Sequence, residues 1–236
     1  MIWVGCSGRY YPHWMGKFYP DDLKKSKWLE YYCQHFNTVE INSTFYRIPK
    51  ITTVKGWIRK VPDDFRISLK MNKQLTHVSR FSDSEVIESF KEIVSLVDDK
   101  LGCVLVQLPP SLKKDFELLD KMCSMLSELK CRCAIEFRHK SWFDPLVYEK
   151  LKDDVVLCLV SSPQVRSPSV FEDYTTEYVY VRFHGTSKWY NHLYSMDELK
   201  EWARIIKRFD EAFVYFNNDF NAYAPRNALE MMKLLD

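Results

Sequence analysis

The stretch LGCVLVQL, residues Leu101–Leu108, is a short apolar run rich in leucine and valine, which is typical of a buried β-strand. Two prolines follow it at residues 109–110, and Lys114–Leu129 then has the apolar spacing of an amphipathic helix. A buried strand followed by a covering helix is the repeating unit of parallel α/β folds. The same unit recurs on both sides of this stretch.

The recurrence extends over the whole chain of 236 residues. Strands are predicted over Ile2–Gly8, Thr38–Phe45, Arg66–Asn72, Leu101–Leu108, Cys131–Arg138, Val155–Ser162, Glu177–Gly185 and Ala212–Asp219. Helices are predicted over Leu23–Phe36, Thr52–Lys60, Asp83–Asp98, Lys114–Leu129, Pro145–Leu151, Met196–Phe209 and Ala222–Leu235. Ser82 and Ser195 are the expected N-caps of two of these helices, the second with Glu198 in a capping box.

The order of the elements predicts a single (β/α)8 fold of the TIM-barrel type, with parallel strands and one domain over residues 1–236. Parallel strands joined by helices need crossover connections, and eight such units in this length favour a closed barrel over an open sheet. The connection between the sixth and seventh strands is the exception. Pro163–Thr176 has no helical period, which predicts an irregular loop.

The composition narrows the class of protein. A hydrophobic content of 46% with 15% aromatic residues is enough for a sizeable core, and the net charge of +2 does not by itself indicate a nucleic-acid partner. The seven cysteines are an odd number without the paired spacing of a zinc site, and the chain starts directly with a predicted strand. No apolar run approaches the roughly 18 residues of a membrane span. We therefore expect a cytoplasmic protein with reduced thiols and no membrane partner.

Successive residues of a strand face opposite sides, so the aliphatic residues of each predicted strand identify its helix-facing set. The remaining positions place polar residues inside the barrel near the carboxyl ends of six strands. They are Glu40, Asn42, Lys70, Asn72, Gln107, Glu136, Arg138, Arg182, His184, Asn217 and Asp219. TIM-barrel enzymes build their active sites at this end. Because interior charges are costly unless paired or hydrated, the pattern predicts an active site there.

The residue types indicate acid/base chemistry, with hydrolysis as the expected reaction and no cofactor required. The predicted catalytic residues are His184 as general acid or base and the carboxylates Glu40, Glu136 and Asp219, which neighbouring cations should keep ionised. Lys70, Arg138 and Arg182 are expected to bind the phosphate or carboxylate of a small anionic substrate. The amides of Asn42, Asn72, Gln107 and Asn217 would fix hydroxyls or an oxyanion.

Further residues are expected on the loops around this end. Tyr11 follows the first strand together with His13 and Trp14, Tyr46 follows the second, and His77 follows the third. We include Tyr11, Tyr46 and His77 among the substrate-binding candidates, although packing at the rim is the more common use of such aromatic residues.

Three alternatives to this interpretation stay open. The acids and bases could form a purely structural ion network, although buried ion pairs stabilise a fold poorly compared with apolar packing. Glu40, Glu136, Asp219 and His184, with His77, could instead bind a divalent metal for phosphoester hydrolysis, as in barrel nucleases. The chain could also be a non-catalytic module that binds a nucleotide or a nucleic acid with its aromatic and basic residues.

The same segments resemble the YecE-like family, also known as domain of unknown function 72, a set of uncharacterised TIM-barrel-like proteins. The matching runs include Gly5-Cys6-Ser7-Gly8, Glu40-Ile41-Asn42-Ser43-Thr44-Phe45-Tyr46, Gln107-Leu108-Pro109-Pro110-Ser111, Glu136-Phe137-Arg138-His139, Arg182-Phe183-His184-Gly185 and Phe216-Asn217-Asn218-Asp219. The resemblance covers nearly the whole chain and implies a TIM-barrel-like fold, but it brings no known reaction. Arg9 and the stretch Thr186–His192 depart from the family pattern.

Overall fold

The computed structural model describes residues 1–151, 155–164 and 178–236. Eight parallel strands form one sheet of the TIM-barrel type with flanking helices, in the order β1-β8-β7-β6-β5-β4-β3-β2. The strands are β1 (Ile2–Cys6), β2 (Thr38–Ile41), β3 (Arg66–Lys70), β4 (Leu101–Gln107), β5 (Cys133–Glu136), β6 (Val155–Ser161), β7 (Tyr178–Phe183) and β8 (Glu211–Phe216). The predicted fold class is confirmed.

Helices lie between most of these strands along the chain. They are α1 (Trp28–Tyr32), α2 (Ser43–Tyr46), α3 (Ile51–Ile58), α4 (Ser84–Val97), α5 (Phe116–Ser127), α6 (Pro145–Lys150), α7 (Met196–Ile206) and α8 (Tyr223–Leu235). Short 3-10 helices lie at Pro12–Trp14, Lys25–Lys27, Asp98–Lys100, Lys140–Trp142 and Phe220–Ala222, and a π-helix lies at Gln74–Val78. No helix of the described residues is long and apolar enough to cross a membrane.

Side-chain caps explain where several helices begin. The Ser195 hydroxyl accepts from the backbone N–H of Glu198, whose carboxylate accepts from the Ser195 N–H, so the predicted capping box is confirmed. The predicted cap Ser82 is wrong by one position, because the Asp83 carboxylate accepts from the Val86 N–H and thereby starts α4. Asp115 caps α5 in the same way.

The chain divides into two compact units. Unit 1 comprises Met1–Glu40, Lys60–Arg66 and Leu159–Asp236, and unit 2 comprises Ile41–Arg59 and Ile67–Cys158. Each is described by itself.

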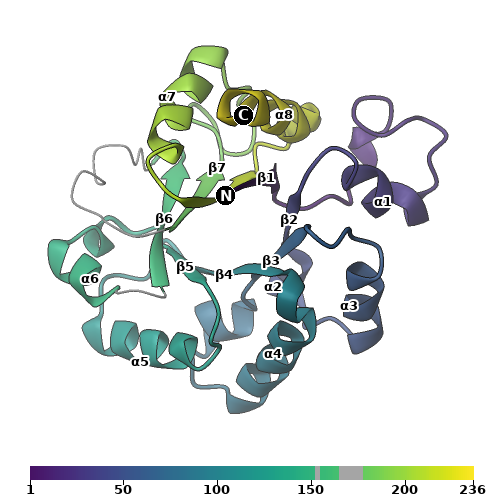
Figure 1. The fold of residues 1–236 in the computed structure, drawn as a ribbon. Coiled ribbons are helices and arrows are strands. Elements are labelled where there is room, and N and C mark those ends of the chain that lie inside the picture. Colours follow the sequence, from purple (N-terminus) through teal and green to yellow (C-terminus); the bar gives the residue numbers. More distant parts are fainter. Residues whose placement is uncertain (152–154, 165–177) are drawn as a thin grey trace. The chain divides into compact units, whose positions relative to one another are not determined.

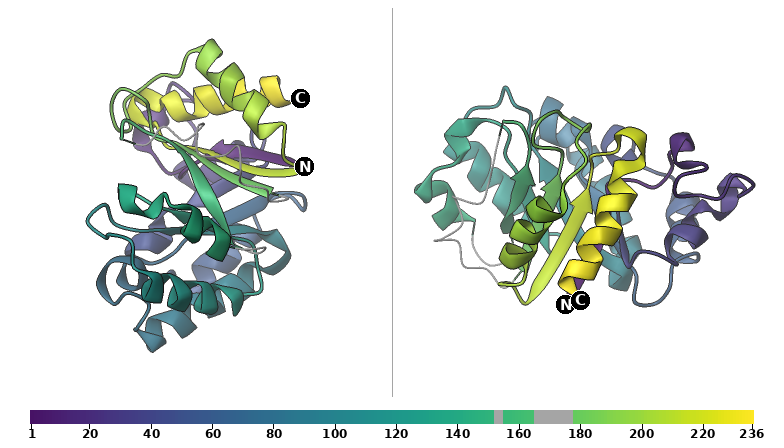
Figure 2. Two further views of the ribbon diagram at one scale, coloured as in Figure 1. Left: turned by 90° about the vertical axis from the view of Figure 1, so that its left-hand side faces the viewer. Right: turned by 90° about the horizontal axis from the view of Figure 1, so that it is seen from above.

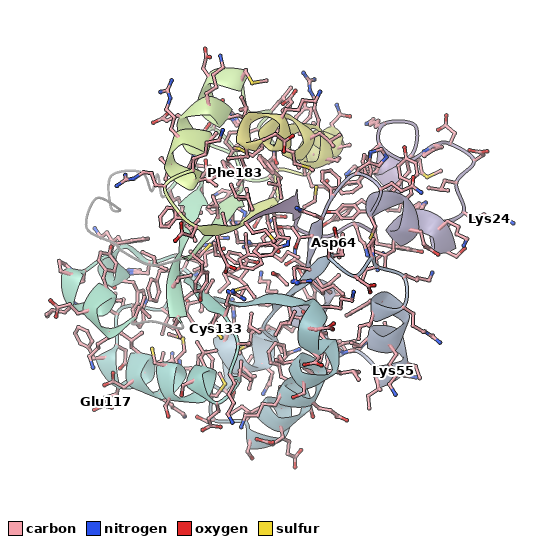
Figure 3. The ribbon with its side chains drawn as sticks, viewed as in Figure 1. Lys24, Lys55, Asp64, Glu117, Cys133 and Phe183 are labelled. Carbon is pink, nitrogen blue, oxygen red and sulfur yellow. The ribbon has the colours of Figure 1, made fainter. Side chains whose placement is uncertain are left out.

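In unit 1, β8 lies between β1 and β7, and α7 and α8 pack beside these strands (Figures 1 and 2). Phe183 lies at the end of β7, where its ring makes an edge contact with the Trp202 ring of α7, with centroids 5.1 Å apart (Figure 3). Phe183 therefore faces the helices, as its strand parity predicts, and Arg182 takes the opposite face.

In unit 2, β4 pairs with β3 and β5 in parallel, and α4 and α5 lie along these strands (Figure 1). Cys133 of β5 is fully buried, whereas Glu117 projects from the outer side of α5 (Figure 3). The apolar face of α5, with Leu119 and Met122, is buried. This division gives α5 the amphipathic pattern read from the sequence.

Several element boundaries differ from those predicted. The second strand ends at Ile41 rather than Phe45, because α2 starts at Ser43 and the Thr44 hydroxyl donates to the Ile41 carbonyl. The long helix predicted over Leu23–Phe36 is replaced by the 3-10 turn at Lys25–Lys27 and the short α1. Most of the predicted irregular loop Pro163–Thr176 lies outside the described residues.

Candidate active site

A buried ion pair lies between β2 and β7 in unit 1. The Arg182 Nη2 atom is 2.7 Å from Glu40 Oε1, and the two side chains are 1% and 0% exposed. The hydroxyl of Tyr180 donates to the other Glu40 oxygen over 2.6 Å. Glu40, Tyr180 and Arg182 therefore all face the interior, as parity predicts for Glu40 and Arg182. Glu40 is an ion-pair partner of Arg182.

His184 follows this group at the end of β7 and is completely buried. Its Nε2 atom lies 3.4 Å from Arg182 Nη1, and its Nδ1 atom lies 3.1 Å from the side-chain amide of Asn217. Because a guanidinium can only donate, Nε2 acts as the acceptor in its contact with Arg182. The rings of Trp189 and Tyr190 pack around His184 at 5.4 and 5.8 Å. His184 is thus held in one orientation.

Asp219 lies just after β8 and is the most accessible acid of this group, with its side chain 14% exposed. The indole N–H of Trp14 donates to Oδ1 over 2.6 Å, and His13 Nε2 lies 3.0 Å from Oδ2. Burial raises the pKa of Asp219 from 3.8 to about 6, although the hydrogen bond from Trp14 and the nearby His13 oppose the rise. The sequence predicts that neighbouring cations keep this carboxyl ionised, whereas burial raises its pKa and outweighs the opposing effects of Trp14 and His13.

Tyr11 and Ser7 connect β1 to the same group. The Tyr11 hydroxyl donates to the Ser7 carbonyl over 2.8 Å, and the Gly8 N–H donates to the Glu40 carbonyl over 2.8 Å. Burial, followed by the charge of Asp219, raises the pKa of Tyr11, so its hydroxyl keeps its proton. The Ser7 hydroxyl oxygen is buried and has no hydrogen-bond partner among the described residues. An unsatisfied buried hydroxyl at a strand end is a candidate ligand contact.

A second polar group lies at the ends of β3 and β4 in unit 2. The Lys70 ammonium donates to Gln107 Oε1 over 2.7 Å and stands 4.2 Å above the Phe45 ring. His77 packs edge-on against the same ring at 5.1 Å, and its Nδ1 atom lies 2.8 Å from the Thr76 hydroxyl. Burial, with the charges of Lys70 and Lys73, lowers the pKa of His77. Burial is the larger cause, and the two lysines add a positive charge beside this end of unit 2.

The remaining predicted residues of unit 2 have different surroundings. Arg138 forms an ion pair with the fully buried Glu136. Asn72 is occupied by the backbone, since its amide donates to the Thr44 carbonyl and its oxygen accepts from the Gln74 N–H. Asn42 begins α2, and its buried Oδ1 atom has no hydrogen-bond partner among the described residues. Tyr46 is 70% exposed and packs only its edge against Phe45.

Within unit 1 the structure brings together Glu40, Arg182, His184, Asn217, Asp219 and Tyr11, and within unit 2 it brings Lys70 and Gln107 to His77. Sequence reasoning missed Tyr180 and Ser7 and gave His13 and Trp14 only a place at the rim. Tyr180 was detectable, because it lies two residues before Arg182 and so shares its face. The contacts of His13 and Trp14 with Asp219 span more than two hundred residues of sequence, and no local pattern predicts them.

A metal site was one of the alternatives. The described residues contain no group of three or more His, Cys, Asp or Glu side chains that could hold a metal ion. Glu40 and Glu136 are paired with arginines, and the neighbours of His184 are Arg182 and Asn217. These donors do not fit the metal-binding alternative, so no step is derived through a metal.

Residues 3–236 match the family model described as "Protein of unknown function DUF72". The UPF0759 protein YunF of Bacillus subtilis is 28% identical, with 100% of this chain and 95% of YunF covered. The crystal structure of a DUF72 family protein from Thermotoga maritima is 32% identical, with a TM-score of 0.86 and coverage of 100% and 99%. A D-psicose 3-epimerase structure matches with a TM-score of 0.60 at 12% identity, which is a likeness of fold alone.

Proposed function

This chain belongs to the DUF72 family, and from its own residues we propose that it is an acid/base enzyme that hydrolyses a small substrate bearing a phosphate or carboxylate. The family assignment supplies the fold but no reaction. The observation that carries the proposal is the position of Asp219 at the carboxyl end of β8, fixed by Trp14 and His13 and open to solvent on one side. Barrel enzymes place their reacting groups at this end of the strands.

Asp219 is suited to exchange a proton with a substrate or a water. With a pKa of about 6, it is largely ionised at neutral pH and still basic enough to accept a proton. The hydrogen bonds from Trp14 and His13 fix its orientation, and within the part of the chain that the structure describes no arginine or lysine forms an ion pair with it. We assign Asp219 the role of general base that activates a water.

Asp219, and not His184, is the residue that exchanges the proton in this proposal. His184 is completely buried, and its Nε2 atom faces the Arg182 guanidinium. A base whose acceptor nitrogen is already engaged is poorly placed to take a proton from a water. We assign His184 a positioning role, in which it orients Asn217 beside the end of β8.

A separate observation, made in unit 2 alone, favours an anionic ligand. Burial and the charges of Lys70 and Lys73 lower the pKa of His77, and those two charges would also attract an anion. Lys70 is partly exposed and presented by Gln107. Lysine is a common ligand of phosphate in proteins.

The proposal is tested by turnover. The chain is incubated with p-nitrophenyl phosphate and a set of small phosphate monoesters and carboxylate-bearing esters, and release of p-nitrophenol or inorganic phosphate is followed. We expect turnover of at least one substrate and a loss of roughly 100-fold or more in Asp219→Asn, the usual range for removal of a general base. Asp197→Asn, at a position 93% exposed in α7, is the control with the wild-type rate. The absence of turnover, or an unchanged rate in Asp219→Asn, would overturn the proposal.

A further inference from the structure

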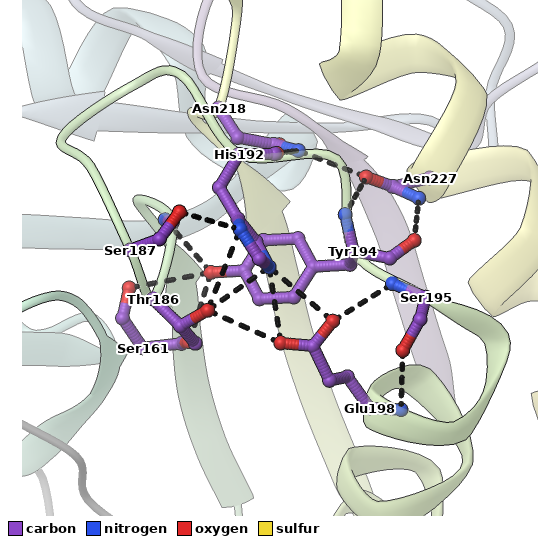
Figure 4. A network of polar contacts seen from close by, with 10 residues as sticks. Ser161, Thr186, Ser187, His192, Tyr194, Ser195, Glu198, Asn218 and Asn227 are labelled. Atoms are coloured by element: carbon purple, nitrogen blue, oxygen red, sulfur yellow. Dashed lines mark hydrogen bonds and ion pairs between the residues drawn. The ribbon is translucent and has the colours of Figure 1, made fainter.

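The loop between β7 and α7 holds a second group of polar side chains, which the proposed function does not use (Figure 4). His192 is its centre. One ring nitrogen, Nε2, lies 3.0 Å from Glu198 Oε1, and the other, Nδ1, lies 3.0 Å from the hydroxyl of Ser187. An acid, an imidazole and a hydroxyl are thus connected in series within unit 1.

The proton positions follow from the partners. An ionised carboxylate can only accept, so Nε2 carries the ring proton and Nδ1 accepts from the Ser187 hydroxyl. Partial burial opposes ionisation of Glu198, but hydrogen bonds from the Ser195 backbone and the neighbouring His192 outweigh it and lower the pKa of Glu198. His192 is therefore aligned to remove the proton of Ser187, with Glu198 stabilising the imidazolium that results.

The surrounding contacts hold this series rigidly. The Thr186 hydroxyl lies 2.9 Å from His192 Nε2 and 3.1 Å from Glu198 Oε1. Behind the ring, the carbonyl of His192 accepts from Asn218, and Asn218 also donates to Asn227 (Figure 4). The Tyr194 ring packs edge-on against the imidazole at 4.7 Å. Such support fixes the rotamers that a nucleophile and its base require.

The hydroxyl end of the series is open to a reagent. Ser187 is exposed, and the side chains of His192 and Glu198 are 17% and 33% exposed. Among the described residues, the backbone N–H groups of Ser187 and Lys188 donate to no backbone carbonyl. Unused N–H groups beside a nucleophile are the donors that a developing oxyanion needs.

We infer that Ser187, His192 and Glu198 form a second reactive site, which transfers acyl groups from small, unhindered esters. The Ser187 oxygen attacks the ester carbonyl as its proton passes to His192 Nδ1, and a tetrahedral oxyanion forms. The oxyanion collapses, the C–O bond to the alcohol breaks, and His192 returns the proton to the departing alcohol. A water activated by His192 then releases the acid and restores the hydroxyl of Ser187. Glu198 is the positioning residue.

The contacts among Ser187, His192 and Glu198 would also arise if their role were purely structural and they only held the loop against α7. Glu198 has such a structural role already, since it completes the capping box with Ser195. The structural role and the reactive site differ in one measurable property, the reactivity of the Ser187 hydroxyl. A purely structural fastening leaves Ser187 an ordinary hydroxyl, whereas the inferred site makes it react with an electrophile at a rate that depends on His192.

A fluorophosphonate probe distinguishes the reactive site from the purely structural role. In the reaction the bond from the Ser187 oxygen to phosphorus forms, the P–F bond breaks, and fluoride leaves as the proton passes to His192. The full chain is treated with the probe, and the labelled residue is identified by peptide mass spectrometry. We expect one adduct on Ser187, none on the exposed Ser195, and a labelling rate lowered about 100-fold in His192→Gln.

Glu198→Gln tests the positioning role. It should lower the labelling rate and shift its pH profile more than Ser195→Ala, which removes the cap hydroxyl but leaves the contact between Glu198 and His192. No adduct on Ser187, or a labelling rate equal in wild type and His192→Gln, would overturn the inference. Ser187→Ala, at an exposed position, is expected to fold, to lose the adduct and to keep the phosphate-ester turnover assigned to Asp219. The two proposals therefore fail independently.

Discussion

Glu40 Oε1 lies 2.7 Å from Arg182 Nη2, and neither side chain is more than 1% exposed. The two residues are 142 positions apart in sequence, on β2 and β7, and Tyr180 adds a hydrogen bond to the same carboxylate. Each buried ion stabilises the other, because the free-energy cost of removing both from water is offset only while the pair is intact. The pair therefore holds the ends of two strands of unit 1 in fixed positions.

Removing one member of the pair should be costly. In Glu40→Gln the buried guanidinium loses its counter-charge, and we expect a loss of about 3–5 kcal/mol in the free energy of unfolding, measured by urea denaturation. The double variant Glu40→Gln/Arg182→Met, which removes both charges, should recover part of this loss. Asp197→Asn breaks an exposed pair with Lys200 and should change stability by less than about 1 kcal/mol. A similar cost for the single and double variants would contradict this coupling.

Asp219 should make stability depend on pH in a defined direction. Its pKa is raised from 3.8 to about 6 in the fold, so between these values the folded chain binds more protons than the unfolded chain. Stability therefore falls as pH rises from about 4 to 6 and levels off above, with a contribution of at most about 3 kcal/mol. In Asp219→Asn this decrease in stability should be absent. The free energy of unfolding of the variant, measured by urea denaturation, should therefore increase relative to that of wild type as pH rises across that range.

Substitution of His13 tests the same carboxyl through its neighbour. The hydrogen bond and charge of His13 oppose the rise in the pKa of Asp219, so His13→Gln should move the fall in stability to higher pH. A shift to lower pH, or an unchanged curve, would show that the contact between His13 and Asp219 does not act on the carboxyl.

The positive potential in unit 2 can be measured through His77. Lys70 and Lys73 contribute to lowering its pKa below the ordinary 6.5, so Lys70→Met should raise the pKa of His77, measured by NMR titration of the ring protons. Lys55→Met, on the exposed side of α3, is the control and should leave that titration unchanged. Equal titration curves in wild type and Lys70→Met would exclude Lys70 as a source of the potential.

Two glycines should respond oppositely to alanine. Gly185 has φ +103°, and an added Cβ would lie 2.5 Å from the Lys188 carbonyl oxygen, so Gly185→Ala should destabilise the fold by about 1–3 kcal/mol and disturb the loop that carries Ser187. Gly56 lies inside α3, and an added Cβ would meet nothing within 4 Å. Gly56→Ala should stabilise by about 0.5–1 kcal/mol, measured by thermal unfolding of both variants. A stabilised Gly185→Ala would contradict the backbone geometry of this loop.

The fold could be predicted because its signals are local. The apolar run Leu101–Leu108 and the period of Lys114–Leu129 each identify one element, and their repetition identifies the fold. Boundaries were less accurate where a side chain acts on its own backbone. The Thr44 hydroxyl bonds the Ile41 carbonyl and helps end β2 early, although Phe45 and Tyr46 are residues that favour strands.

The sequence predicts which side chains of the site face the interior, but not which of them contact one another. Strand parity places Glu40, Arg182 and His184 in the interior, and their contacts agree. It cannot say that Arg182 pairs with Glu40, or that His13 and Trp14 approach Asp219, because these contacts join residues that are far apart in the sequence. Ser187 and His192 lie in the stretch that departs from the family pattern, and their connection to Glu198 of α7 is evident only from the positions of the side chains.

The central claim is that Asp219 takes up the proton in the hydrolysis of a small anionic substrate. The most direct measurement is the pH dependence of kcat/KM for release of p-nitrophenol or inorganic phosphate, from whichever ester of the set is turned over, in wild type and Asp219→Asn. We predict that the wild-type rate rises with pH through a midpoint of about 6, and that this limb is absent in the variant. A limb of the same height and midpoint in Asp219→Asn would contradict the assignment.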